Sequence, residues 1–293
     1  MQSHYDAMVG RLRWVMLAVM LFSMVATLVG QPAEFWSHPG QAIRFDGLSI
    51  YNHTNHKFEF FLGYGWAPYL TACLAYFAAA FALVSALPDR LGLIATFSFI
   101  LGHFYGGENW LAVRWHAGAG GGLTLYSCAL AAAVALAVLP TLSDARFVLM
   151  RLRWIAVAAL LLDFSNTLLG QPHSYWQNPA TVHEGNALSR YFLTHGWATF
   201  CVYDAAYCGV ILLLASALPR TGAFISTFAF LLSGYGGATN WFFYVWRMGI
   251  GAPILYAVAL SAITVMVAFP ISGFGAELNS RPPGPVATSS PSA

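Results

Sequence analysis

Two aspartates stand inside long apolar runs, Asp163 in LLLDFSNTLL and Asp204 in FCVYDAAYC. A charged side chain at bilayer depth costs at least about 2.5–3.5 kcal/mol, so such residues usually face a protein interior. Asp163 comes seven residues before Gly170, and Asp204 comes seven residues after Trp197. If both runs are helical, both carboxyl groups lie about 10 Å below the same boundary. We therefore expect them to meet between two consecutive helices.

Paired carboxyl groups in such a place suit acid–base chemistry. Burial and a neighbouring like charge can hold two carboxyl groups in different protonation states, so that one serves as acid and the other as base. Asn166 and Tyr207 each follow one of the aspartates by three residues and share its helical face. The structural alternative is that each aspartate hydrogen-bonds a Tyr, Asn or Thr and holds two helices together.

A second polar group occurs in GHFYGGENWLAVRWHAG at 102–118, where His103 and Glu108 are candidates to assist the aspartates. The related segment at 233–249, SGYGGATNWFFYVWRMG, has Gly234 and Thr239 in their places. Both segments keep an Asn-Trp pair, which either contacts a substrate or has an architectural role. The expected substrate contacts outside the aspartate faces are Asn109, Trp110, Gln171, Trp176, Trp197, Asn240 and Trp241.

No metal site is expected from the sequence, and no cofactor is required by this chemistry. His53, His56 and Glu59 are spaced three apart, but they fall in a long loop for which no helix is expected. The spacing therefore does not indicate a metal site.

Eight apolar stretches are long enough, or nearly so, to cross a bilayer core, which needs about 20 helical residues. They cover residues 14–30, 66–87, 91–107, 122–140, 154–170, 197–218, 222–238 and 253–270. Glycine pairs near the ends of the third and seventh stretches suggest helix breaks there. The expected fold is an all-α polytopic membrane protein with eight transmembrane helices and long outer loops that form a cap.

An internal duplication organises these stretches. Gly30-Gln31-Pro32 corresponds to Gly170-Gln171-Pro172, and RLRW at 11–14 corresponds to RLRW at 151–154, both at an offset of 140 residues. Since each copy holds four stretches, both copies enter the membrane from the same side, related by a pseudo-two-fold axis along the membrane normal. The predicted organisation is a cytoplasmic N-terminus (1–13), a first four-helix repeat (14–140), a cytoplasmic linker (141–153), a second four-helix repeat (154–270) and a disordered cytoplasmic tail (271–293).

Composition agrees with a membrane protein, because 58% of the residues are hydrophobic and only 8% are charged. The net charge of +2 excludes nucleic acid as an expected partner. Of the 13 Lys and Arg residues, eight lie on the side of the N-terminus and five on the opposite side, which places both termini in the cytoplasm. The interpretation is a multi-pass protein of a bacterial inner (plasma) membrane, with lipid, an apolar small molecule and membrane-complex subunits as partners.

Three functions fit these observations. The favoured hypothesis is a membrane-embedded enzyme, a membrane isomerase or cyclase, that uses the carboxyl pair on a lipid, isoprenoid or other apolar substrate from the outer face. The second is a non-catalytic subunit of a membrane complex that binds a cofactor or has a structural role. The third is a small-molecule transporter, since parallel repeats are one transporter plan.

Overall fold

The computed structural model describes residues 2–38, 60–113, 115–117, 121–142, 144–249 and 251–269, and every regular element in these ranges is helical. The long helices are α1 (Gln2–Val29), α3 (Trp66–Ala86), α4 (Asp89–Val113), α5 (Gly122–Val138), α6 (Ala145–Leu169), α8 (Trp197–Ala217), α9 (Arg220–Tyr244) and α10 (Gly251–Ile263). The short elements are η1 (Ala33–Trp36), η4 (Leu139–Thr141), η5 (His173–Trp176), η6 (Pro179–Thr181), α7 (Ala187–Thr194) and η7 (Thr264–Ala268), the last being a π-helical turn that continues α10.

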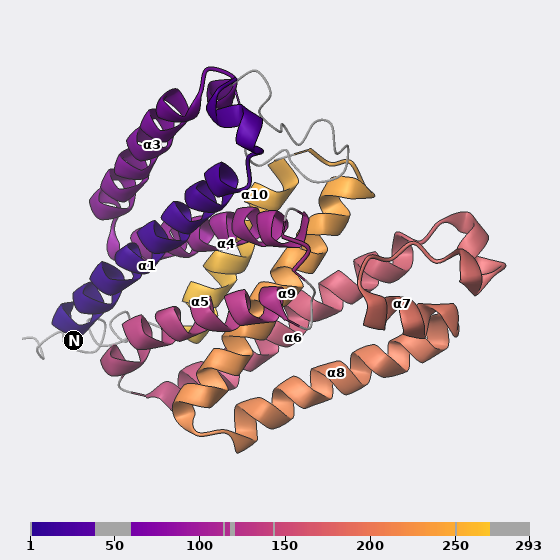
Figure 1. Ribbon diagram of the computed structural model, residues 1–293. Helices are drawn as coiled ribbons and strands as arrows, with labels where there is room; N and C mark the ends of the chain where they lie inside the picture. Colours follow the sequence, from indigo (N-terminus) through magenta and orange to yellow (C-terminus); the bar gives the residue numbers. More distant parts are fainter. Residues whose placement is uncertain are drawn as a thin grey trace, which may run out of the picture.

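Five of the described helices are long and apolar enough to cross a membrane, as expected of a multi-pass membrane protein. The five spans are Asp6–Val29, Trp66–Ala86, Gly122–Thr141, Trp197–Ala217 and Gly251–Ala268. The other three long helices, α4, α6 and α9, carry more polar residues and pack in the interior of the bundle (Figure 1).

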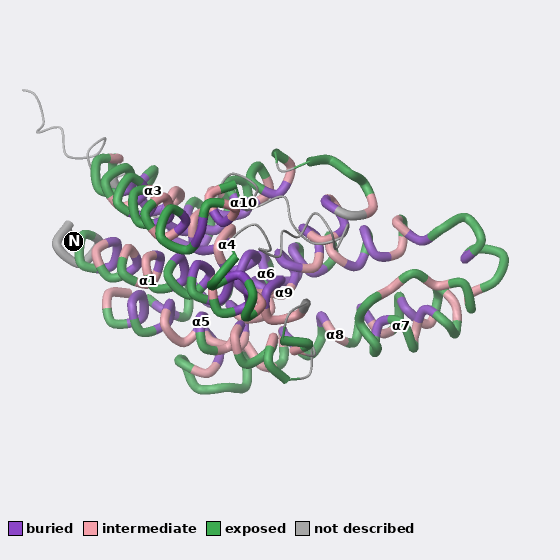
Figure 2. The backbone as a smooth tube through the Cα atoms, turned by 45° about the horizontal axis from the view of Figure 1, so that its top comes forward, coloured by how far each residue is buried: buried purple, intermediate pink, exposed green. Residues whose placement is uncertain are grey.

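The helices form a layered bundle with α3 and α8 at opposite edges (Figure 1). The most extensive packing joins α6 to α9 and α1 to α4. Figure 2 shows the buried residues concentrated in this centre, while α3 and α8 are largely exposed. Two helices pack mainly against the other half of the chain. α5, in the first half, packs mainly against α9, and α10, in the second half, packs mainly against α4.

Glycine and proline determine where α3 and α8 begin and end. Gly65 and Gly196 precede these helices at φ 114° and 103°, in the region that favours glycine. Each helix ends one residue before a Leu-Pro pair, which cannot continue a helix. The observed bounds therefore fall within one residue of the apolar stretches predicted at 66–87 and 197–218.

The glycine pairs of α4 and α9 do not break these helices. The two helices run to Val113 and Tyr244, six residues beyond the expected ends at 107 and 238. Gly236 and Gly237 instead allow side chains of other helices to approach the α9 backbone. α6 begins at Ala145, inside the stretch expected to link the two repeats, and the predicted tail at 271–293 lies outside the described residues.

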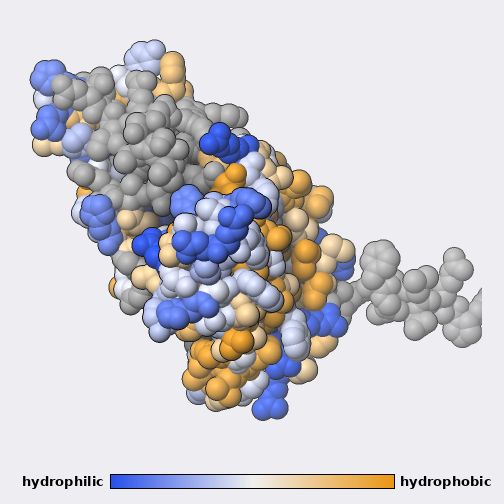
Figure 3. Space-filling model, turned by 90° about the vertical axis from the view of Figure 1, so that its right-hand side faces the viewer, coloured by the Kyte–Doolittle hydropathy of each residue, from blue (hydrophilic) through white to orange (hydrophobic). Residues whose placement is uncertain are grey.

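Polar residues gather at one end of the molecule. Figure 3 shows the end that carries α7, where hydrophilic residues lie between sides covered by hydrophobic ones. This end is built by the segment between α6 and α8, which contains η5, η6 and α7.

Candidate functional site

Two carboxylates approach one turn of α9 from different helices. A Cβ atom built on Gly236 would collide with the Glu108 carboxylate from α4, and one built on Gly237 would collide with the Asp163 carboxylate from α6. Only glycine leaves this space free. Because α4 precedes residue 140 and α6 follows it, the first and second halves of the chain meet here.

Asp204 completes a set of acidic groups around Asp163. Among the described residues, Glu184, Glu108 and Asp204 are the charged groups whose electrostatic effect on the Asp163 carboxyl is resolved. Asp204 is 8% exposed, and its Oδ1 atom is buried without a hydrogen-bond partner. Because a buried charge without a partner is costly, burial favours the protonated form of such a carboxyl group.

Aromatic side chains line the space between α6, α8 and α9. Tyr207 lies on the face of Asp204, with ring centroids 5.8 Å from Phe164 and 5.3 Å from Phe230. Tyr203 lies 5.8 Å from Tyr207. These contacts pack Phe164 of α6 and Phe230 of α9 against the face of α8 that carries Asp204, while Asp163 itself lies against Gly237 of α9. On α6, Asn166 is also buried, with its Nδ2 atom unpartnered.

Gln171 fixes the loop next to this site. Its Nε2 donates to the carbonyl oxygens of Thr167 (2.8 Å) and His183 (3.2 Å), and its Oε1 accepts from the His183 backbone N–H (2.9 Å). The loop is thereby held back against the end of α6. Gln171 thus has a clear structural role, and the loop it holds carries Glu184.

Glu184 is an acidic residue near the site that the sequence analysis did not select. Its Oε1 accepts from the Asn186 backbone N–H at 2.7 Å, and its carbonyl oxygen accepts from Arg190 Nε at 2.7 Å. Burial raises the pKa of Glu184, an effect that the backbone N–H groups of Asn186 and Gly185, together with Arg190 and His183, only partly oppose. The available signal was that Glu184 is the only acidic residue between Asp163 and Asp204 in the sequence.

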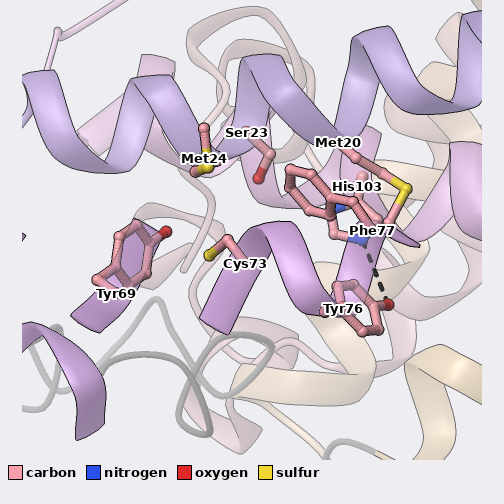
Figure 4. A pocket seen from close by; sticks show the side chains of 8 residues that line it. All are labelled: Met20, Ser23, Met24, Tyr69, Cys73, Tyr76, Phe77 and His103. Carbon is pink, nitrogen blue, oxygen red and sulfur yellow. Dashed lines mark hydrogen bonds between the residues drawn. The ribbon is translucent and has the colours of Figure 1, made fainter. Parts of the chain in front are cut away.

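His103 lies in a different place. It lines a pocket between α1, α3 and α4 (Figure 4), and its Nε2 is 3.4 Å from the Tyr76 hydroxyl. The structure therefore places Glu108 and Asp163 against neighbouring glycines of α9, and His103 in a separate pocket of the first half.

The tryptophans of the two Asn-Trp segments pack against the ends of α1 and α6. The Trp110 ring lies directly against Gly30, and the Trp241 ring lies in the same way against Gly170. Asn240 Oδ1 accepts a hydrogen bond from the Tyr105 hydroxyl at 3.0 Å, which joins α9 to α4. These contacts favour the architectural alternative for both tryptophans and for Asn240.

The remaining predicted contacts, Asn109, Trp176 and Trp197, differ in burial. Asn109 is buried on α4 with an unpartnered Nδ2 atom. Trp176 and Trp197 are 48% and 56% exposed, as expected for side chains at a membrane boundary. Within the described residues, no three His, Cys, Asp or Glu side chains form a group that could hold a metal ion. His53, His56 and Glu59 lie outside the described residues.

Comparison of the chain with protein-family models, curated proteins and solved structures finds no match.

Proposed function

We propose that the chain is a membrane-embedded enzyme in which Asp163 and Asp204 perform acid–base chemistry on a lipid, isoprenoid or other apolar substrate. The observation that carries the proposal is the buried, unpartnered Asp204 Oδ1, on the face of α8 whose Tyr207 packs against Phe164, the residue after Asp163. An unpaired carboxyl oxygen in an apolar wall is available to a reacting carbon–hydrogen bond or double bond.

The proposed reaction is an isomerisation or cyclisation. One carboxyl group donates a proton to a substrate double bond, and the other, as carboxylate, removes a proton from a neighbouring carbon. The substrate gains one proton and loses one, so no further reactant is needed. The cycle closes when the proton taken up by the base returns to the acid, with Glu184, whose charge acts on Asp163, as the proposed relay.

The aromatic wall supports this assignment. Protonation of a double bond creates a carbocation, and cations are attracted to the faces of aromatic rings within about 6 Å. Phe164, Tyr203 and Tyr207 supply such rings next to the aspartates.

The proposal includes eight spans in two four-helix repeats, with the site opening at the outer end. Equal lengths support it, since α3 and α8 each have 21 residues and α4 and α9 each have 25. The contacts of Gly30 with Trp110 and of Gly170 with Trp241 support it as well. The carboxyl pair belongs to the second repeat alone, because Ser23 and Cys73 occupy the corresponding positions of the first.

Deuterium transfer tests the proposed reaction even while the substrate is unidentified. The purified protein in lipid nanodiscs is incubated in D₂O with a total membrane lipid extract, and the lipids are analysed by mass spectrometry. We expect carbon-bound deuterium in one lipid class, with a rate reduced about 10²–10⁴-fold by Asp204→Asn or Asp163→Asn. Asp6→Asn, on the exposed surface of α1, is the matched control. Equal incorporation by wild type and Asp204→Asn would exclude this chemistry.

A proton-coupled or cation-coupled transporter is the second candidate, because Glu108 and Asp163 converge on α9 where the two halves meet. Transport sites of repeat proteins lie at such interfaces. Uptake of labelled lipid-extract solutes into proteoliposomes under a pH gradient, abolished by Glu108→Gln and accompanied by no deuterium transfer, would favour it.

A further inference from the structure

The second arginine of the RLRW segment makes a similar contact in both halves of the chain. Arg13 on α1 donates from Nη2 to the Val84 carbonyl oxygen near the end of α3, at 3.0 Å. Arg153 on α6 donates from Nη1 to Ser216 Oγ near the end of α8, at 3.3 Å. Each guanidinium group is therefore fixed where the first two long helices of its half meet. This end of the bundle carries the N-terminus and lies opposite α7 (Figure 1).

Both guanidinium groups keep hydrogen-bonding capacity. Within the described part of the chain, the contact with the neighbouring helix is the only hydrogen bond that either group donates. The two Nε atoms are buried, whereas Nη1 of Arg13 and Nη2 of Arg153 are neither hydrogen-bonded nor enclosed. Each place thus offers a positive charge and a free N–H group with no described carboxylate bound to it. A phosphate group fits such a place, because arginine forms strong, often bidentate hydrogen bonds with phosphate oxygens.

Exposed tryptophans indicate the depth of both places in the membrane. Trp14 and Trp154 directly follow the two arginines and are 67% and 56% exposed. The Arg153 guanidinium lies 5.7 Å from the centroid of the Trp154 ring. Tryptophan is enriched at the level of the lipid headgroups, where its ring is in contact with both lipid and water. The last turns of α3 and α8 also expose Leu83 and Leu213, which gives acyl chains an apolar surface. These features favour a membrane lipid over a dissolved ion as the source of the phosphate.

We propose that the junction of α1 with α3 and the junction of α6 with α8 each bind the headgroup of an anionic phospholipid. Arg13 and Arg153 bind the phosphate, and Trp14 and Trp154 lie beside the headgroup. Basic sites between helices on the cytoplasmic side of membrane proteins bind such lipids, and the distribution of Lys and Arg predicts that this end is cytoplasmic. An anionic headgroup is preferred, because a zwitterionic one carries its own cation, which competes with the arginine for the phosphate.

Helix capping is the structural alternative, because a positive charge near the C-terminal end of a helix interacts favourably with the helix dipole. Capping uses one N–H group and needs no exposed tryptophan. The two halves nevertheless share all four residues of RLRW, although Ser23 and Asp163 differ at corresponding positions further along the same helices. The arginine and the tryptophan thus occur together in both copies, as a lipid site requires.

Native mass spectrometry of the full-length protein in detergent tests both sites, with phosphatidylglycerol and phosphatidylcholine of identical acyl chains as probes. We expect two phosphatidylglycerol molecules to bind more tightly than phosphatidylcholine. Arg13→Gln and Arg153→Gln should each weaken one of the two binding steps about 5-fold, the contribution of one arginine near an anionic membrane surface. Arg13→Lys and Arg153→Lys should weaken the same steps less, since lysine keeps the charge but not the planar set of donors.

Arg146→Gln is the matched control, because Arg146 is exposed in the first turn of α6 and its loss changes the net charge equally. Equal affinity of the wild type for both lipids, or an unchanged preference in the Arg13→Gln, Arg153→Gln double variant, would overturn the proposal and leave helix capping. Displacement of the bound lipid by inorganic phosphate would also overturn it, because the sites would then take a dissolved ion. Asp163→Asn and Asp204→Asn should leave phosphatidylglycerol binding unchanged, so this test is independent of the proposed reaction.

Discussion

Single glycines on α9 determine how closely the carboxylates approach that helix. At Gly237, an added Cβ would meet both oxygens and the carboxyl carbon of Asp163, whose short side chain has little freedom to move aside. At Gly236, the nearest atom is a terminal oxygen of the longer and more flexible Glu108 side chain. The two positions therefore differ in how well they can accept a methyl group.

Gly237→Ala should consequently destabilise the protein by about 1–3 kcal/mol, the usual cost of overpacking, and Gly236→Ala by less. Gly209→Ala on α8 is the control, because no atom lies within 4 Å of its Cβ position. At such a site the higher helix propensity of alanine stabilises by up to about 1 kcal/mol. Denaturant unfolding of the detergent-solubilised variants measures these differences. A Gly237→Ala protein as stable as the wild type would contradict the assigned contact.

The sequence predicts part of this arrangement at the residue scale. Equal depth on consecutive helices predicts that Asp163 and Asp204 meet, whereas the contact that the structure gives Asp163 is with Gly237 of α9. His103 and Glu108 are five residues apart on one helix, which rotates them by about 140° relative to each other, so they face different neighbours. The contribution of Glu184 depends on a loop held by Gln171, and no periodic pattern in the sequence reveals that loop.

Helix pairs differ in how closely they approach. An added Cβ at Gly234 on α9 would lie 2.8 Å from backbone atoms of Ala159 and Leu160 on α6. Small residues permit such close contact between membrane helices. The corresponding position of α4 is His103, because α1 and α4 leave space there for the pocket of Figure 4.

Gly234→Ala should therefore separate α6 from α9 and destabilise the protein by about 3 kcal/mol or slightly more, since a backbone cannot swing aside as a side chain can. The same substitution at Gly102 on α4, where nothing lies within 4 Å, should be tolerated. Thermal unfolding in nanodiscs compares the two. Equal melting temperatures would show that the helices do not touch at Gly234.

The ends of the helices show why hydropathy predicts some boundaries and misses others. α1 and α6 begin at Gln2 and Ala145, well before the apolar stretches predicted from residues 14 and 154. Arginines in these early turns hydrogen-bond carbonyl groups at the ends of other helices. Arg13 donates to the Val84 carbonyl at 3.0 Å, and Arg151 donates to the Val267 carbonyl at 2.8 Å. The apolar stretch therefore starts only after these arginines, although the helix itself begins before them.

For the whole molecule, the number of spans is the main open prediction. Hydropathy identifies five spans because α4, α6 and α9 face other helices and carry polar residues, whereas a lipid-facing helix must be apolar. The duplication predicts all eight. The contacts between halves were not predictable, because no residue pattern indicates which half α5 packs against.

Labelling with a membrane-impermeant maleimide in a variant without the four native cysteines separates the two topologies. Cysteines introduced at the exposed positions Ser37, Asp144, Gln177 and Thr221 report the side of each connection. With eight spans, Ser37 and Gln177 are labelled from outside, and Asp144 and Thr221 are not. With only the five apolar spans crossing, Asp144 would be labelled together with Ser37, so this position decides between them.

The reciprocal packing of α5 on α9 and of α10 on α4 has a consequence for biosynthesis. Arg220 at the start of α9 donates a hydrogen bond to the Leu139 carbonyl at 2.6 Å, so the end of the first half is tied to a residue made much later. The ribosome thus releases α5 into the membrane before its principal neighbour exists. A chain that terminates between the halves exposes helix faces that nothing covers. Membrane proteases and chaperones should treat such a fragment as misfolded rather than as half of a working protein.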